Sequence, residues 1–180
     1  MMRLTRKLQI CAGVLLLLAA PPAHAQTMAE AAWANMAVAV QLCETRTNDM
    51  TAKAQTFRDT GFSEWVERSS TNSDTTHYFT APADSVVVEL YYGEMPEECR
   101  VKSAHLGVTL ASQLLDDLIP KLYPTYVRKV EIGPIGPSGQ PATCVRYEDP
   151  SNEIGHVVGA STEQGCVDNG TSLIFSSSRV

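Results

Sequence analysis

Histidine and cysteine are the residues of this sequence best suited to catalysis or metal binding, and their spacing limits the chemistry available to them. Three histidines, His77, His105 and His156, follow an apolar N-terminal segment. No two of them lie at i, i+4 and no H-E-x-x-H motif occurs, so the spacing predicts no zinc site. His156 lies in the apolar stretch IGHVVGAS, which is typical of a structural histidine on a strand.

Hydrolysis by a serine or histidine is the main enzymatic alternative, because the members of such a site need not be close in sequence. The sequence contains no G-x-S-x-G elbow and no phosphate-binding GxxxxGK[ST] or GxGxxG loop. We therefore identify no catalytic residue, no cofactor-binding residue and no cofactor. The first hypothesis is a non-enzymatic binding or structural protein, and the alternative is a hydrolase whose site is assembled only in three dimensions.

Four cysteines follow the N-terminal segment: Cys43, Cys99, Cys144 and Cys166. An even number behind an export signal predicts two disulfides, and four cysteines allow three connectivities. We favour Cys43–Cys99 and Cys144–Cys166, because each pair then closes within its own half of the chain. A thiol-redox protein is a third hypothesis, but no C-x-x-C motif is present to support it.

Charged residues cluster in ways that could form binding sites. Adjacent carboxylates occur at 97–98, 116–117 and 148–149, and we expect all three pairs to be solvated surface. A calcium site built from Asp149, Asn152 and Glu153 lacks the spacing of an EF-hand loop. Four basic residues would form an anion-binding patch if their strands adjoined, although salt bridges are the use we favour: Arg100, Lys102, Arg128 and Lys129.

Residues 1–25 have the pattern of an export signal. A basic start with Arg3, Arg6 and Lys7 precedes an apolar run at 10–20 and the cleavage sequence Ala23-His24-Ala25. The apolar run is shorter than the roughly 20 residues of a membrane span. We expect a periplasmic or secreted protein with one domain over residues 26–180 and no membrane span after cleavage.

The charge of the expected mature chain limits its partners. Residues 26–180 contain 11 basic and 20 acidic side chains, a net charge of −9, whereas the whole chain has −6. Nucleic acids and anionic membrane surfaces attract basic patches, so an acidic chain argues against both. The expected partner is an unidentified envelope or extracellular protein, or a small ligand.

Two helices are predicted at the start of this domain. A first helix should span about 28–44, because Thr27 and Glu30 match a capping box. Its apolar face includes Trp33, Met36, Val40 and Cys43, so Cys43 should point inward. A second helix should begin at Asn48 or Asp49 and end at Gly61.

Four short strands and a helix should follow. The segments 62–68, 75–80, 85–92 and 99–103 predict an antiparallel meander. Thr109 is then expected to cap a helix that Pro120 and Pro124 end or kink. Its apolar stripe should face the sheet with Leu110, Leu114 and Leu118, with Ala111, Leu115, Ile119 and Leu122 beside them.

The remaining chain should be β-structure. We predict strands at 126–132, 142–147, 154–160 and 171–177, with a long irregular loop over 133–141. The expected fold is therefore α+β: N-terminal helices, an antiparallel β-meander covered by one helix, C-terminal β-strands and two disulfides.

This arrangement resembles small uncharacterised bacterial periplasmic domains. The resemblance is carried by Cys43, Gly61-Phe62, Tyr78-Phe79, the segment CRVKS at 99–103 and the Ala/Leu-rich stretch 111–118. It covers the first two thirds of the expected mature chain and does not account for Cys144 and Cys166. Such domains have no assigned activity, so the resemblance implies a fold and a compartment only.

Overall fold

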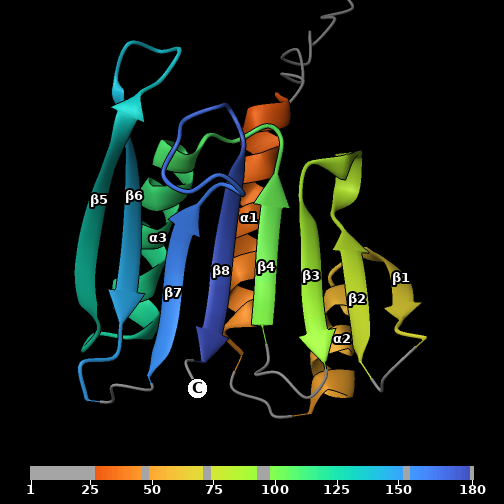
Figure 1. Ribbon diagram of the computed structural model, residues 1–180. Coiled ribbons are helices and arrows are strands. Elements are labelled where there is room, and N and C mark those ends of the chain that lie inside the picture. The colour runs from red at the N-terminus through yellow and green to blue at the C-terminus, as the bar shows by residue number, and fades with distance from the viewer. Residues whose placement is uncertain (1–26, 46–48, 71–73, 93–97, 152–154, 179–180) are drawn as a thin grey trace, which may run out of the picture.

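The computed structural model describes residues 27–45, 49–70, 74–92, 98–151 and 155–178, so the predicted export signal lies outside the described residues. The described chain forms three α-helices, one short 3-10 helix and eight strands (Figure 1). The helices are α1 (Met28–Cys43), α2 (Met50–Asp59), η1 (Pro82–Asp84) and α3 (Val108–Leu122). The strands are β1 (Ser63–Arg68), β2 (Thr75–Thr80), β3 (Val87–Tyr92), β4 (Glu98–Ser103), β5 (Val127–Ile135), β6 (Pro141–Glu148), β7 (His156–Ser161) and β8 (Ser172–Ser178).

All eight strands belong to one antiparallel sheet with the order β1-β2-β3-β4-β8-β7-β6-β5. The predicted meander is confirmed as β1 to β4. The C-terminal strands continue the same sheet, because β8 returns along β4 and places β7, β6 and β5 beyond it. This long-range pairing joins the two halves of the chain.

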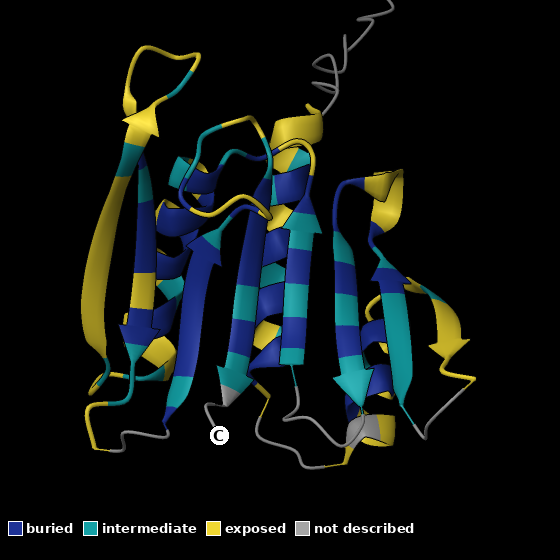
Figure 2. Ribbon diagram, viewed as in Figure 1, coloured by how far each residue is buried: buried dark blue, intermediate teal, exposed yellow. Residues whose placement is uncertain are grey.

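The three α-helices lie on one face of the sheet (Figure 1). The side chains that point toward them are buried, as the row Val88, Val101, Ile174 and Ala160 illustrates across four neighbouring strands. Figure 2 shows this burial as dark bands on the central strands, whereas β5 is exposed along most of its length. An antiparallel sheet covered on one face has the alternation expected of an α+β protein.

The two N-terminal helices lie where the sequence predicts them, with their ends within about two residues of the expected positions. Thr27 accepts a hydrogen bond from the Glu30 amide, and the Glu30 carboxylate accepts one from the Thr27 amide, which completes the capping box. Asp49 caps α2 through the amides of Thr51 and Ala52. Gly61 follows α2 at φ 91°, in the left-handed region that glycine adopts without strain.

Helix α3 differs from the prediction at its start and ends within the predicted region. It begins at Val108 after Gly107, and no side chain caps it. The Thr109 hydroxyl instead accepts a hydrogen bond from the Thr143 amide of β6. Pro120 lies in the last turn, where the helix continues to Leu122.

The buried face of α3 keeps most of the predicted apolar stripe, since Ala111, Leu114, Leu115 and Ile119 are buried as expected. It is rotated away from Leu110, which is 43% exposed. The buried set of α3 is Val108, Ala111, Ser112, Leu114, Leu115 and Ile119. The rotation places the polar side chains of Ser112 and Asp116 against β6, where their partners lie.

The predicted long loop is mostly a β-hairpin. β5 continues to Ile135 and β6 begins at Pro141, with a register shift after Ile132. The turn between them contains Gly139 at φ 76°. Glycine and proline residues therefore mark a bulged strand end and a turn.

Both predicted disulfides are confirmed. Cys43 at the end of α1 bonds to Cys99 of β4, and Cys144 of β6 bonds to Cys166 in the segment between β7 and β8. Two disulfides fit a protein of an oxidising compartment. Within the described ranges, the helices are too short or too polar to cross a membrane.

Candidate ligand-binding face

The face of the sheet opposite the helices, here called the open face, has a continuous row of aromatic and charged residues. Strand register places eight residues side by side, one from each strand: Trp65, Tyr78, Glu89, Arg100, Phe175, Gly159, Arg146 and Lys129. Gly159 belongs to this row for a steric reason, because a Cβ there would come within 2.5 Å of the Phe175 ring. No described helix covers this face (Figure 1).

A hollow of about 250 Å³ opens on this face over β2, β3 and β4. Its lining consists of Thr76, Tyr78, Glu89, Tyr91, Glu98 and Arg100. These residues come from two adjacent rows of the register, Tyr78-Glu89-Arg100 and Thr76-Tyr91-Glu98. The hollow thus combines two tyrosine rings, two carboxylates, one guanidinium and the threonine hydroxyl.

The aromatic side of the hollow is a stacked pair. The rings of Trp65 and Tyr78 are 4.2 Å apart at an interplanar angle of 6°. Their separation is close to the spacing of neighbouring strands, so the rings stand on the sheet as parallel plates. The Tyr78 hydroxyl donates to Glu67, and burial, followed by this carboxylate, raises the pKa of Tyr78. Trp65 itself is 55% exposed, so the pair presents apolar ring surface to solvent.

The charged side of the hollow is held by ion pairs. Arg100 lies 3.0 Å from Glu98, and Lys102 lies 2.8 Å from Glu89 and 2.7 Å from Glu163. Partial burial acts to lower the pKa of Lys102, but its hydrogen bonds to Glu163 and Glu89 raise it overall. The same contact lowers the pKa of Glu163. Charges of both signs are therefore fixed in place before any ligand arrives.

The four basic residues of the alternative anion-binding patch do not come together. Arg100 and Lys102 belong to β4, whereas Arg128 and Lys129 belong to β5, and three strands separate them. Each of the four is engaged in an ion pair with a carboxylate, which confirms the use favoured from sequence. The nearest partners of Arg128 and Lys129 are Asp116 and Glu148.

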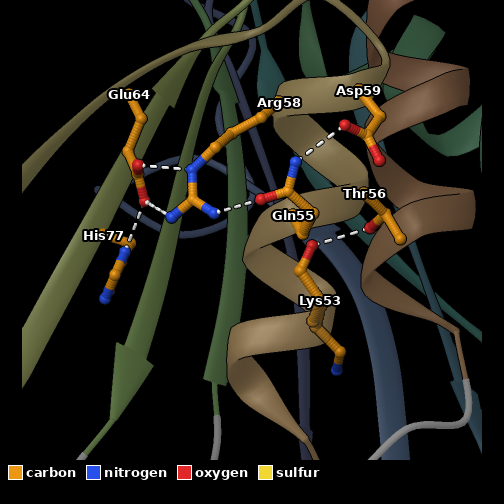
Figure 3. A network of polar contacts seen from close by, with 7 residues as sticks. All are labelled: Lys53, Gln55, Thr56, Arg58, Asp59, Glu64 and His77. Atoms are coloured by element: carbon orange, nitrogen blue, oxygen red, sulfur yellow. Dashed lines mark hydrogen bonds and ion pairs between the residues drawn. The ribbon is translucent and has the colours of Figure 1, made fainter.

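His77 belongs to a polar network on the helix side of the first strands (Figure 3). Arg58 of α2 donates from Nε and Nη2 to the two oxygens of Glu64, at 2.7 and 2.9 Å. His77 Nδ1 lies 2.6 Å from Glu64 Oε1. The Arg58 hydrogen bond is the main cause that lowers the pKa of Glu64. Because Glu64 pairs with both Arg58 and His77, the network ties α2 to β1 and β2.

His156 belongs to a second polar cluster, at the ends of α1, β7 and β8. Its Nε2 lies 2.9 Å from Ser176 Oγ and 3.4 Å from Glu44 Oε2, and its Nδ1 lies 3.0 Å from the Tyr126 hydroxyl. A catalytic serine–histidine–acid triad has the serine and the acid on different ring nitrogens. Here both lie on Nε2, and Glu44 and Ser176 are buried, so the contacts describe a packed structural cluster.

The third histidine, His105, lies apart from these clusters and is exposed. The structure therefore brings no two of the predicted histidines together among the residues it describes. Across the same residues, no group of three or more His, Cys, Asp or Glu side chains could hold a metal ion. Asn152 and Glu153 of the calcium alternative lie outside the described ranges.

The prediction of solvated carboxylate pairs is wrong for two of their members. Asp116 accepts hydrogen bonds from Arg128 and Tyr147, and Glu148 pairs with Lys129 and Arg146. Arg128 of β5 reaches Asp116 on α3 across the helix–sheet contact, and Lys129 reaches Glu148 from the neighbouring strand. The sequence alone shows neither contact. Glu97 lies outside the described part of the chain, and Glu98 pairs with Arg100.

Comparisons with protein families, with characterised proteins and with solved structures find no match to this chain. The resemblance to periplasmic domains therefore stays a prediction, and the site must be interpreted from its own geometry.

Sequence reasoning did not identify the open face as a site. The signal was present in one hairpin: the turn between β1 and β2 places Arg68 opposite Thr75, and counting back places Trp65 opposite Tyr78. Their stacking follows from a correct hairpin register. The neighbouring Glu89 and Arg100 require the registers of two further strand pairs, which turn lengths alone do not determine.

Proposed function

We propose that this chain is an exported, non-catalytic binding protein, periplasmic or secreted, whose ligand surface is the open face of the sheet. The observation that carries the proposal is the hollow over β2 to β4, with its stacked aromatic side and its paired charges. Binding sites typically combine apolar ring surface with a few fixed polar groups. The two disulfides and the predicted signal support export.

The chemistry of the hollow favours a neutral, hydroxyl-rich ligand with a flat apolar side, and a saccharide has these properties. The free side of the Tyr78 ring offers the apolar contact, while Glu89, Glu98 and Arg100 offer hydrogen-bond acceptors and donors. Because the charges are already paired with one another, a strongly charged ligand would have to displace an existing ion pair.

Trp65 provides a direct test of this proposal. The chain has two tryptophans, Trp33 on α1 and Trp65, which stacks on Tyr78 beside the hollow, so Trp33→Phe leaves Trp65 as the only indole reporter. We expect soluble chitotetraose or cellotetraose to change the fluorescence of this variant in a saturable manner. Tyr78→Ala should abolish the change.

Arg146→Gln is the matched control, since Arg146 lies in the same row but outside the hollow. The proposal is overturned if neither oligosaccharide changes the fluorescence or releases heat in calorimetry at millimolar concentration. It is equally overturned if Arg146→Gln weakens binding as much as Tyr78→Ala.

The second candidate function is hydrolysis, because Ser176 Oγ lies within hydrogen-bond distance of His156 Nε2. A fluorophosphonate probe tests it by labelling an activated serine covalently. The binding proposal expects no labelling. Labelling that Ser176→Ala and His156→Gln both abolish would favour the hydrolase.

A further inference from the structure

The two edges of the sheet differ in length and polarity. β1 has six residues, three of them charged, and its Glu64 is tied to Arg58 of α2. β5 has nine residues and is exposed along most of its length. Its exposed apolar side chains are Val127, Val130, Ile132 and Ile135, and Ile132 is 63% exposed.

An edge strand has a row of backbone N–H and C=O groups that no neighbouring strand satisfies. Proteins usually protect such edges with charges, prolines, bulges or short strands. In β5 the bulge and the proline come only after Ile132, where the register shifts and Pro134 follows. The charges that precede them are of both signs, Arg128, Lys129 and Glu131, so a second strand of matching charge pattern can pair with them. The stretch from Val127 to Gly133 remains regular, exposed and partly apolar, which suits pairing with another strand.

The geometry of antiparallel pairing restricts how β5 could pair with itself. Two identical antiparallel strands are related by a two-fold axis perpendicular to the sheet. Residues that oppose each other must point to the same face, because side chains alternate along each strand. The axis therefore lies midway between the two copies of one residue, which oppose each other directly.

Charge selects among these registers. An axis at Arg128, Lys129 or Glu131 would place each of these charges opposite its own copy, which is repulsive. An axis at Ile132 would extend the pairing past the register shift. An axis at Val130 places Lys129 opposite Glu131 on both sides of the axis and Val130 opposite Val130.

We propose that two copies of this chain pair antiparallel through β5 with the two-fold axis at Val130. The two eight-stranded sheets then form one continuous sheet with all helices on the same face. Lys129, already 2.6 Å from Glu148 of its own chain, gains Glu131 of the second copy. Among the described residues no ion pair engages the Glu131 side chain, so the pairing gives it a partner.

Charge reversal tests the register. Sedimentation equilibrium of the mature protein over a concentration series should show a monomer–dimer equilibrium. Glu131→Lys should raise the dissociation constant at least about tenfold, because it creates two lysine–lysine contacts across the axis. The double variant Lys129→Glu, Glu131→Lys should restore association, since it exchanges the two charges. Glu67→Lys makes the same change at the other edge and should leave association unchanged.

Cysteine substitution tests the position of the axis independently. In the proposed register the two copies of residue 130 are direct neighbours, at a Cα separation that a disulfide can span. Val130→Cys should form a covalent dimer on mild oxidation, whereas Ile132→Cys, opposite Arg128, should not.

A chain that stays monomeric at every concentration overturns the proposal. So does Glu131→Lys with the association of the wild type, or Ile132→Cys that cross-links as well as Val130→Cys. These outcomes leave the binding proposal untouched, because the hollow lies over β2 to β4 and the pairing uses β5.

Discussion

The two ends of the sheet are fastened to their helices by the same kind of contact, built with opposite polarity. At one end Arg58 of α2 forms two hydrogen bonds with Glu64 of β1. At the other end Arg128 of β5 forms two, both at 2.7 Å, with Asp116 of α3. A two-bond arginine–carboxylate pair fixes orientation as well as distance, so each pair sets how its helix lies on the edge strand.

The ends differ in what supports the pair. Beneath α2, Phe57 stacks on Phe79 of β2 with ring centroids 4.8 Å apart. Beneath α3 the support is polar: Ser112 Oγ donates to the Thr143 carbonyl and accepts from the Val145 amide. Since β6 pairs with β7 only over residues 146–148, these backbone groups lie beyond the ladder. The hydroxyls of α3 thus replace the missing strand partner at one end, whereas apolar packing holds the other.

The largest expected difference between the two halves concerns their disulfides. Cys43–Cys99 closes a separation of 56 residues and Cys144–Cys166 closes 22. The loop-entropy relation gives about 4 kcal/mol for replacing the first pair by serine and about 3 kcal/mol for the second. Denaturant unfolding of both double-serine variants measures the order. A larger loss for the Cys144–Cys166 pair would mean that local packing around it outweighs the loop entropy.

The next expected effect comes from the hydroxyl that completes β6. Ser112→Ala leaves a buried amide and a carbonyl without their partner, which should cost about 2 kcal/mol of unfolding free energy. Gln113→Ala, at the exposed neighbouring position, should change stability by no more than about 0.5 kcal/mol. Equal effects of the two variants in denaturant unfolding would show that Ser112 contributes only helix propensity.

The sequence predicts the helices and strands of this protein better than it predicts which of them lie side by side. The capping box at Thr27 and the stop at Gly61 are local signals, and both are confirmed. The disulfide pairing also follows from chain order. What local signals cannot show is β8 lying against β4, a contact between segments far apart in the chain.

The same reason explains the errors on α3 and on the open face. Thr109 has the composition of a helix cap, but a backbone amide of β6 reaches its hydroxyl. Arg100 next to Phe175 exists only once β8 is in place. Contacts that depend on strand order are therefore the ones that sequence reasoning missed.

Removal of either arginine pair should have a smaller effect on the free energy of unfolding. Arg58→Gln and Arg128→Gln should each cost about 1 kcal/mol or less, because both guanidinium groups are partly exposed and screened by solvent. Arg58→Gln should cost more than Arg128→Gln, because it leaves a less exposed carboxylate without its partner. Glu64 is 16% exposed, whereas Asp116 is 34% exposed. Double-mutant cycles with Glu64→Gln and Asp116→Asn measure the coupling. A larger coupling for Arg128 would contradict this order.

The smallest effects should appear in the pH dependence of stability. The two ends differ there because His77 contacts Glu64 at one end and Tyr147 donates to Asp116 at the other. Hydrogen bonds from Arg58 and Arg128 lower the pKa of Glu64 and of Asp116 from their ordinary values of 4.5 and 3.8. The stabilisation of the folded state that these lowered pKa values represent is complete above pH 4.5 for Glu64 and pH 3.8 for Asp116. It is lost as the pH falls through the lowered pKa of each folded group.

Tyr147, which donates to Asp116, responds on the alkaline side only. Burial, then the Asp116 carboxylate, raises its pKa from 10.0 to about 12. The stabilisation that this raised pKa represents is fully present below pH 10 and is lost as the pH rises to about 12. Spectrophotometric titration of the tyrosines should therefore contain a late phenolate step near pH 12 that Tyr147→Phe removes. Tyr78, whose pKa is also raised, should contribute its own step in both proteins. Tyr126→Phe, outside this network, should leave the late step in place. If the step near pH 12 survives Tyr147→Phe, Tyr147 is not its source, and the two ends of the sheet do not differ in this way at high pH.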